Sequence, residues 1–349
     1  MSRKTDESTP EQVVPTILSI GSAHELVQKA MSKGDFDTAR RVGQITLSNS
    51  DILGDCADYH NLATAFSRAD DYLTAFLLVE KGLGQFPYNI TLLADAVYYG
   101  SNCNEYEKCE QYIATLKKRP LGLWNWRAFT FLIDYYMGKS DWVEDTQTLF
   151  AFTDEALELA LSYQQVLPTE EKAYMAESKV RSLRERYYLS TLDHDKAQTE
   201  HELCEAALLK AINAKTFPAV QCCLRYADRL FEQQRYEEVI GICERALQYG
   251  EDQPSARLGY FLYLSAQAKD ALIHQEKAYA DTARVQSALD DYDAAYRSMD
   301  NLTYQNNIET RAIILSTKSG VALPKALDDS DPTLSQLSAL QNLIGHTSD

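Results

Sequence analysis

The sequence predicts an all-α protein, and three observations support this prediction. Apolar residues recur three and four positions apart, the spacing of one face of a helix, along most of the 349 residues. Short polar turns separate these segments, and the alternation typical of strands is not sustained anywhere. Only 14 Gly and 9 Pro are present, too few for a turn-rich β protein. Helices alone are therefore expected to build the core.

Composition and charge narrow the possible functions. The chain holds 34 Lys and Arg against 51 Asp and Glu, a formal net charge of −17. This acidity does not suit contact with a phosphate backbone, so we expect no direct nucleic-acid binding and favour a basic partner. No apolar run is long enough for membrane insertion, and the first ten residues lack the apolar segment of a secretory signal. Together with 7 scattered cysteines, these features predict a cytoplasmic protein with free thiols.

An acidic residue followed by an aromatic residue recurs along the chain. The aromatic residues are Phe36, Tyr72, Tyr106 and Trp142, at intervals of 36, 34 and 36 residues. Acidic side chains suit helix N-termini, where they accept hydrogen bonds from free N–H groups, so each pair is expected to open a helix. Three positions after each of the first three aromatics stands a small residue: Ala39, Ala75 and Cys109. The same spacing returns further on, where Val239 follows Tyr236 and Ala295 follows Tyr292. The regular interval predicts an internal helical repeat.

The unit that begins at Cys56 resembles the tetratricopeptide repeat family, whose helix-turn-helix unit has about 34 residues. Nine positions carry the resemblance: Tyr59, Leu62, Ala63, Phe66, Tyr72, Ala75, Val79, Gly82 and Pro87. The segment 226–246 fits nearly as well. The resemblance implies a right-handed superhelical solenoid, in which the small Ala63 and Ala75 let paired helices approach closely.

These patterns divide the chain into a flexible tail at 1–12, the solenoid at 13–320, a linker at 321–330 and a C-terminal amphipathic helix at 331–345. The repeat units are expected near 20–54, 56–89, 90–121, 124–168, 169–218, 220–251 and 255–305. Units 124–168 and 169–218 diverge from the pattern. In the first of them two registers stay open: a helix that opens at Trp142, or one that contains Ala156 and Ala160 and ends before Pro168.

The predicted C-terminal helix has an apolar stripe between Asp331-Pro332, which suit a helix start, and Gly345, which suits its end. The stripe consists of Leu334, Leu337, Leu340, Leu343 and Ile344. A solenoid needs its last unit covered, so we expect this helix to cap the array, with docking into the groove as the alternative. Truncation after Gly320 is then expected to lower the melting temperature.

Motifs for catalysis and cofactors are missing, which predicts that the chain is not an enzyme, has no catalytic residues and needs no cofactor. The sequence has no phosphate-binding loop, nucleophile elbow or dinucleotide fingerprint. The nearest metal motif begins at His201, but Glu205 stands where a zinc protease helix has its second histidine. A site made by His194, His201 and Cys204 is conceivable, yet exposed helix residues are the simpler interpretation, and no metal site is predicted.

The family resemblance implies that first helices line a concave partner-binding face. The candidate residues are His60, Thr64, Arg68, Asp95, Tyr98, Asn102, Asp134, Gln221, Asp228 and Glu232. Chaperone-binding members hold a carboxylate with a clamp of Lys, two Asn, Lys and Arg, and the clamp positions here read His24, Gln28, Asn61, Thr91 and Asp95. Only Asn61 agrees, and an exposed Asp95 would repel a carboxylate, so a chaperone C-terminal tail is disfavoured.

The sequence therefore predicts a non-catalytic protein–protein interaction scaffold or adaptor. Its partner is expected to be a peptide or a protein, with a basic contact surface, held on the concave face. Two alternatives stay open: a ligand- or peptide-responsive regulator, and a structural accessory subunit of a larger enzyme complex.

Overall fold

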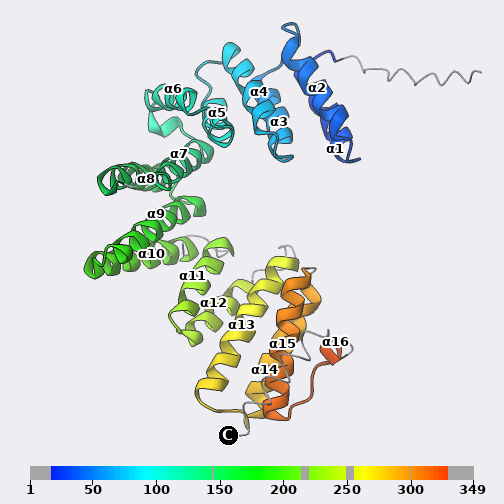
Figure 1. Ribbon diagram of the computed structural model, residues 1–349, viewed down its shortest axis with the longest axis vertical. Coiled ribbons are helices and arrows are strands. Elements are labelled where there is room, and N and C mark those ends of the chain that lie inside the picture. The colour runs from blue at the N-terminus through cyan, green and yellow to red at the C-terminus, as the bar shows by residue number, and fades with distance from the viewer. Residues whose placement is uncertain (1–16, 144, 214–219, 249–254, 300, 329–349) are drawn as a thin grey trace, which may run out of the picture. The chain divides into compact units, whose positions relative to one another are not determined.

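The computed structural model describes residues 17–143, 145–213, 220–248, 255–299 and 301–328 (Figure 1). Within these ranges the ordered elements are all helices, and no strand occurs. Contacts between Cα atoms divide the chain into two compact units: unit 1 ends at Pro168 and unit 2 begins at Thr169. This division coincides with the predicted boundary between the two divergent repeats.

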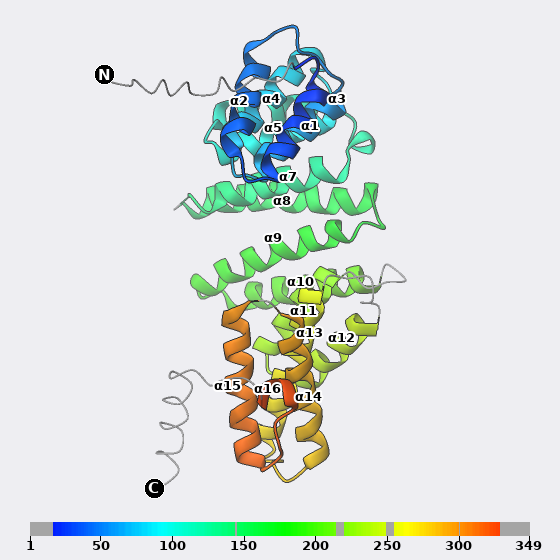
Figure 2. The same ribbon diagram turned by 90° about the vertical axis from the view of Figure 1, so that its right-hand side faces the viewer.

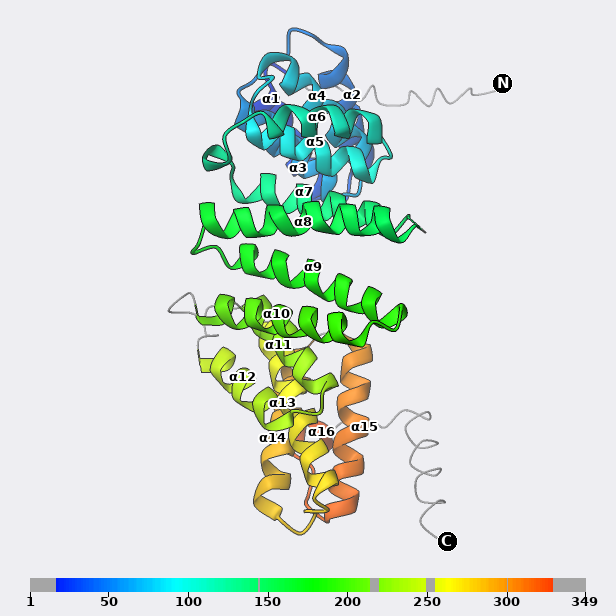
Figure 3. The same ribbon diagram turned by 90° about the vertical axis from the view of Figure 1, so that its left-hand side faces the viewer.

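Unit 1 consists of four helix pairs, one in each of the predicted ranges 20–54, 56–89, 90–121 and 124–168. Its elements are α1 (Ile20–Met31), α2 (Phe36–Ser48), α3 (Cys56–Ser67), α4 (Tyr72–Gln85), α5 (Ile90–Asn102), α6 (Tyr106–Lys117), the 3₁₀ turn η1 (Leu121–Leu123), α7 (Trp126–Ser140) and α8 (Thr146–Val166). The helices of each pair pack on each other, as α7 and α8 do in Figure 3. The first helices also stack in order, α1 on α3, α3 on α5 and α5 on α7.

Acidic side chains start several helices as the pattern predicts. Asp35 accepts a hydrogen bond from the Thr38 N–H at 3.0 Å, and Asp71 accepts one from the Thr74 N–H at 3.1 Å. These bonds satisfy N–H groups that have no partner inside the helix.

The helix predicted to open at Trp142 does not do so. Helix α7 extends to Ser140, Asp141 follows as its C-terminal cap, and Asp145 instead accepts from the Thr148 N–H to begin α8. The structure thus has the other register, in which Ala156 and Ala160 are buried in a helix that ends before Pro168.

Close approach within the pair α3–α4 depends on small residues. Ala63 and Ala75 are both fully buried, and a Cβ placed on Gly82 would lie 2.9 Å from Tyr59 Cγ. Such tight contacts leave no room for a longer side chain.

Ala63→Leu is therefore expected to overpack the α3–α4 pair and to destabilise the protein by roughly 1–3 kcal/mol. Urea unfolding followed by circular dichroism measures the change. Leu77 on α4 is 38% exposed, so Leu77→Ala serves as a control that should unfold much closer to wild type. An Ala63→Leu variant as stable as wild type would contradict this packing.

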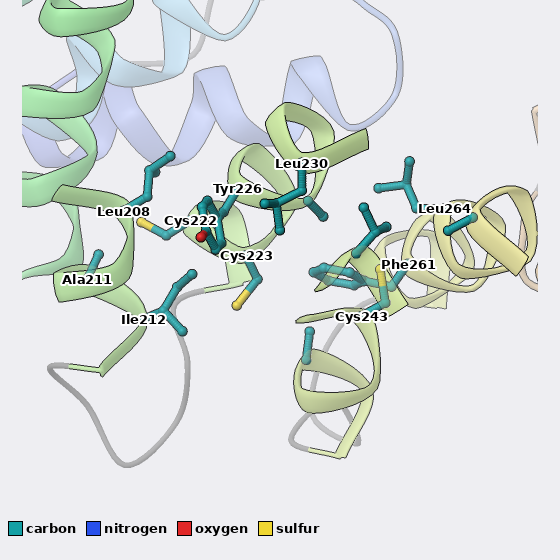
Figure 4. Close-up of a cluster of buried hydrophobic side chains, with 14 of the residues drawn as sticks. Leu208, Ala211, Ile212, Cys222, Cys223, Tyr226, Leu230, Cys243, Phe261 and Leu264 are labelled. Carbon is teal, nitrogen blue, oxygen red and sulfur yellow. The ribbon is translucent and has the colours of Figure 1, made fainter. Parts of the chain in front are cut away.

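Unit 2 also begins with helix pairs. Its elements are α9 (Glu171–Ser190), α10 (His194–Asn213), α11 (Val220–Glu232), α12 (Tyr236–Gln248), α13 (Ser255–Gln275), α14 (Thr282–Ser298), α15 (Leu302–Ser319) and α16 (Lys325–Asp328). The long helices α9 and α10 lie side by side (Figure 2). One buried cluster joins α10, α11, α12 and α13 through residues that include Leu208, Tyr226, Cys243 and Phe261 (Figure 4).

The cysteines of this cluster are free thiols in an apolar environment. Cys222, Cys223 and Cys243 are all fully buried. Burial raises the pKa of Cys223 to about 11 and that of Cys243 to about 12. The thiolate form is therefore scarce at neutral pH, and these residues serve as core packing rather than as nucleophiles.

The end of unit 2 differs from the predicted arrangement in three ways. Tyr292 does not open a helix, because α14 begins ten residues earlier, at Thr282, and buries Tyr292 completely. Helix α15 packs on α14 as an additional helix. The predicted linker 321–330 contains the short turn α16, whose Leu327 is buried in the cluster formed by α13, α14 and α15. The predicted helix 331–345 lies outside the described residues.

None of the helices in the described ranges is both long enough and apolar enough to cross a membrane.

Candidate partner-binding face

The surface formed by α1, α3, α5 and α7, here called the first-helix face, is tied together by a buried carboxylate. Asp95 on α5 is fully buried, its Oδ2 lies 2.5 Å from His60 Nδ1 on α3, and its Oδ1 accepts from Arg127 Nη1 on α7 at 3.3 Å. A buried charge is stable only when it is paired in this way. Asp95 therefore holds three helices together. The prediction that Asp95 is an exposed contact for a partner is wrong, because its side chain is buried.

This arrangement also removes one argument against a carboxylate ligand, because the Asp95 charge is opposed by Arg127 and lies below the surface. The other clamp positions still lack cations. Gln28 Nε2 lies 3.0 Å from His24 Nε2, and Thr91 accepts a hydrogen bond from Asn125 at 2.9 Å. These positions therefore offer no lysine or arginine to a chaperone tail.

Polar contacts continue the link between α3 and α5. Thr64 Oγ1 lies 3.3 Å from the Tyr99 hydroxyl, and both side chains are at least half-buried. Burial, with the nearby Asp95 charge, raises the pKa of Tyr99. Thr64 thus contributes mainly to the packing between helices, while Arg68 at the C-terminal end of α3 is exposed.

Three candidate residues come together in a hollow between α5 and α7. Tyr98, Asn102 and Asp134 all line this hollow, which has a volume of about 370 Å³. The Tyr98 ring stacks on the Phe131 ring with centroids 4.4 Å apart, which fixes one wall. The remaining lining residues are Ser101, Tyr106, Tyr135, Gly138, Lys139 and Trp142.

A second hollow of about 510 Å³ shares Tyr106, Lys139 and Trp142 with the first. Its other walls come from the starts of α6 and α8 and the turn before α8: Asn104, Val143, Thr148 and Phe152. Trp142 is 83% exposed and Tyr106 is 42% exposed, so two large rings lie open to solvent where the hollows share their lining. Exposed aromatic surface of this kind is enriched at binding sites.

The charges between α6 and α7 are paired. Lys139 Nζ donates to Glu110 Oε1 at 2.6 Å, and the Tyr135 hydroxyl donates to the same oxygen at 2.9 Å. Burial acts to raise the pKa of Glu110, but these two hydrogen bonds outweigh it and leave the pKa below its usual value. Burial and the Glu110 charge together raise the pKa of Tyr135. Glu110 thus stays ionised and holds Lys139 at the hollow.

The sequence-based reasoning missed Tyr106, Phe131 and Trp142 as site residues. Tyr106 and Trp142 were assigned to helix starts, and Phe131 was not singled out. The density of aromatic residues between Trp124 and Trp142 was the available signal, because a solenoid core alone does not require so many rings in one segment.

The candidates of unit 2 lie on α11 and do not share the hollows of unit 1. Gln221 is exposed, whereas Asp228 and Glu232 line a polar hollow of about 440 Å³ with Arg225 and Arg229. The Tyr260 hydroxyl lies 3.4 Å from Asp228 Oδ1, and burial raises the pKa of Asp228. This hollow carries charges of both signs, so it offers no simple preference for a basic ligand.

The histidine motif of α10 is part of an ion-pair network. His201 Nδ1 lies 2.7 Å from Glu185 Oε1, and Arg229 Nη2 donates to Glu185 Oε2 at 2.9 Å, while Cys204 is buried. Among the described residues, no group of three His, Cys, Asp or Glu side chains is placed to hold a metal ion. The motif is therefore explained by contacts between helices.

No protein-family model matches the sequence, and no curated protein matches it at a significant level. Several solved structures are similar to the chain at low sequence identity. A thermophilic tetratricopeptide repeat protein of Thermus thermophilus is 16% identical, with a TM-score of 0.44 over 62% of this chain and 98% of the other. A tetratricopeptide repeat protein of Parabacteroides merdae is 14% identical, with a TM-score of 0.42 over 84% and 98%. The human IFIT1 dimer with PPP-AAAA is 10% identical, with a TM-score of 0.46 over 94% and 78%.

The helix pairs themselves define the architecture. Each pair in unit 1 has two antiparallel helices joined by a short turn, first helices stack on first helices, and buried alanines lie in the α3–α4 pair. These features make the described part of the chain a helical repeat protein built of stacked helix pairs.

Proposed function

We propose that this protein is a non-catalytic interaction scaffold that binds a peptide segment of a protein partner on unit 1, in the hollow between α5 and α7 of the first-helix face and in the second hollow that adjoins it. The observation that supports the proposal is the pair of adjoining hollows, which combine exposed Trp142 and Tyr106 with Tyr98, Asn102 and Asp134. Concave, largely apolar sites with a few polar groups are typical of ligand binding. Rigid helices supply the walls, so little ordering cost is added on binding.

Site-specific photo-crosslinking tests this proposal. A benzoylphenylalanine at position 102, on α5 and in the lining of the first hollow, is expected to capture a discrete partner from native extract. The same probe at position 107, exposed on α6, serves as the matched control and should capture far less. Equal capture at both positions, or none at 102, would exclude this face as the binding surface.

The partner's contact surface is expected to be basic, because the chain carries a net charge of −17 and Asp134 lines the first hollow. Affinity for the captured partner should therefore fall as ionic strength rises, since salt screens attraction between exposed charges. Titrations at low and at high salt measure this change. An affinity that does not depend on salt would mean that recognition is apolar.

A further inference from the structure

The hollow between α5 and α7 and the second hollow, which adjoins it on the side of α6 and α8, differ in chemistry. The first has polar side chains in its wall, among them Asp134, Asn102 and Lys139, and the Lys139 charge is already opposed by Glu110 at 2.6 Å. The second is lined mainly by apolar groups, including Val143 and Phe152. Trp142 lines both hollows, so two neighbouring side chains of one bound peptide can occupy them together.

Aromatic ring faces in this part of unit 1 already hold the protein's own cations. Lys139 Nζ lies 4.8 Å from the centroid of the Phe152 ring, and the Arg127 guanidinium lies 4.9 Å from that of Trp126. Each of these cations is also paired with a carboxylate of the chain. Indole gives the strongest cation–π attraction of the aromatic side chains. Among the described residues, no cation of the chain lies over Trp142, which is 83% exposed.

We propose that the hollows recognise a basic residue next to a large apolar residue in the partner peptide, an inference that rests on the proposed function. The basic side chain lies in the first hollow, against the faces of Trp142 and Tyr106 and within the field of the Asp134 carboxylate. The apolar side chain lies in the second hollow against Val143 and Phe152. The acidic chain attracts a basic segment, and the aromatic walls select its sequence.

Gly138 provides a way to close the first hollow without disturbing the core. It lies within α7 and lines the hollow, and a Cβ at this position would meet no atom within 4 Å. Gly138→Leu therefore places a side chain in the hollow while it improves helix propensity. Gly241 in α12 has equally open surroundings and lines neither hollow, so Gly241→Leu is the matched control.

The probe is a capped octapeptide, Gly-Ser-Gly-Arg-Leu-Gly-Ser-Gly, titrated into the full chain by calorimetry. Wild type is expected to bind it with a Kd below about 1 mM. Replacing Arg by citrulline, which is neutral and nearly isosteric, should weaken binding roughly fivefold to thirtyfold, and replacing Leu by Ser should weaken it about tenfold. Gly138→Leu should weaken binding at least about tenfold, whereas Gly241→Leu should match wild type.

The variant Trp142→Leu distinguishes the cation–π contribution to binding from the apolar contribution, because it removes the aromatic ring but keeps an apolar side chain. It should weaken binding of the Arg peptide roughly fivefold or more, and binding of the citrulline peptide much less. Equal binding of the Arg and citrulline peptides, undiminished binding by Gly138→Leu, or no measurable binding by wild type would overturn the inference. Capture of a partner at position 102 despite such a result would leave the proposed function standing, whereas failed capture there would count against the function itself.

Discussion

Replacing Arg181 with methionine is expected to destabilise unit 2 by about 3–5 kcal/mol. Arg181 Nε donates to Glu177 Oε1 at 2.6 Å, and its Nη1 donates to Glu200 Oε2 at 3.0 Å. All three residues are buried between α9 and α10. Without the guanidinium, two buried carboxylates lose this partner, and the desolvation cost of their charge is offset less, although Glu200 Oε1 still accepts from Arg184 Nε at 2.7 Å.

Equilibrium unfolding in urea measures this effect. Arg284→Met serves as the control, because Arg284 and Glu276 form an ion pair exposed to solvent and its loss should change little. Replacing Arg181 and Glu177 together by methionine should recover part of the lost stability, since an apolar pair of similar volume carries no buried charge. Wild-type stability in Arg181→Met would show that this network contributes nothing.

A chain that ends after Gly320 is expected to lose roughly 2–4 kcal/mol of stability, the second large effect. The truncation removes Leu327, which is 2% exposed, and the partly buried Val321 and Leu323, all packed against the cluster of α13, α14 and α15. The apolar surface they cover would then face water. Thermal unfolding and light scattering would record a lower melting temperature and aggregation.

A second chain that ends after Asp328 separates this effect from that of the predicted helix 331–345. It retains Leu327 and α16 but lacks the predicted stripe of leucines. If the helix caps unit 2, this chain should also melt earlier than the full chain. Equal melting of the full chain and the chain ending at Asp328 would contradict the cap, while unchanged melting after truncation at Gly320 would contradict the role of Leu327.

Features that depend on local chemistry could be predicted from the sequence. Asp35 and Asp71 begin helices because each carboxylate reaches an N–H three residues ahead. Ala63 and Ala75 lie at tight positions because one helical face repeats every three to four residues. Both relations involve residues close in the sequence, so a single repeat contains all the information needed.

Two kinds of feature could not be predicted from the sequence: those decided by competition between neighbouring acidic residues for one helix start, and those that depend on partners far away in the sequence. Asp141-Trp142 matches the pattern of a helix start, but the N-terminal cap of α8 is Asp145. The pattern alone does not decide which of these two acidic residues begins the helix. Asp95 was predicted as a surface contact because its position in α5 matches the family's binding face. Its actual partners lie 35 and 32 residues away, in the helices on either side. Only the packing of three repeats reveals that the carboxylate is buried.

The shared carboxylate of Asp95 has a consequence for how unit 1 opens. Helical repeats usually unfold by fraying inward from an end, one repeat after another. Here His60 on α3 and Arg127 on α7 are both paired with the buried Asp95 carboxylate on α5. Opening the repeat that contains α3 or α7 therefore removes one partner of this carboxylate and destabilises the neighbouring repeat. Amide hydrogen exchange should therefore be fast in α1 and α2 and uniformly slow from α3 to α7, and that stretch should exchange as a single cooperative block.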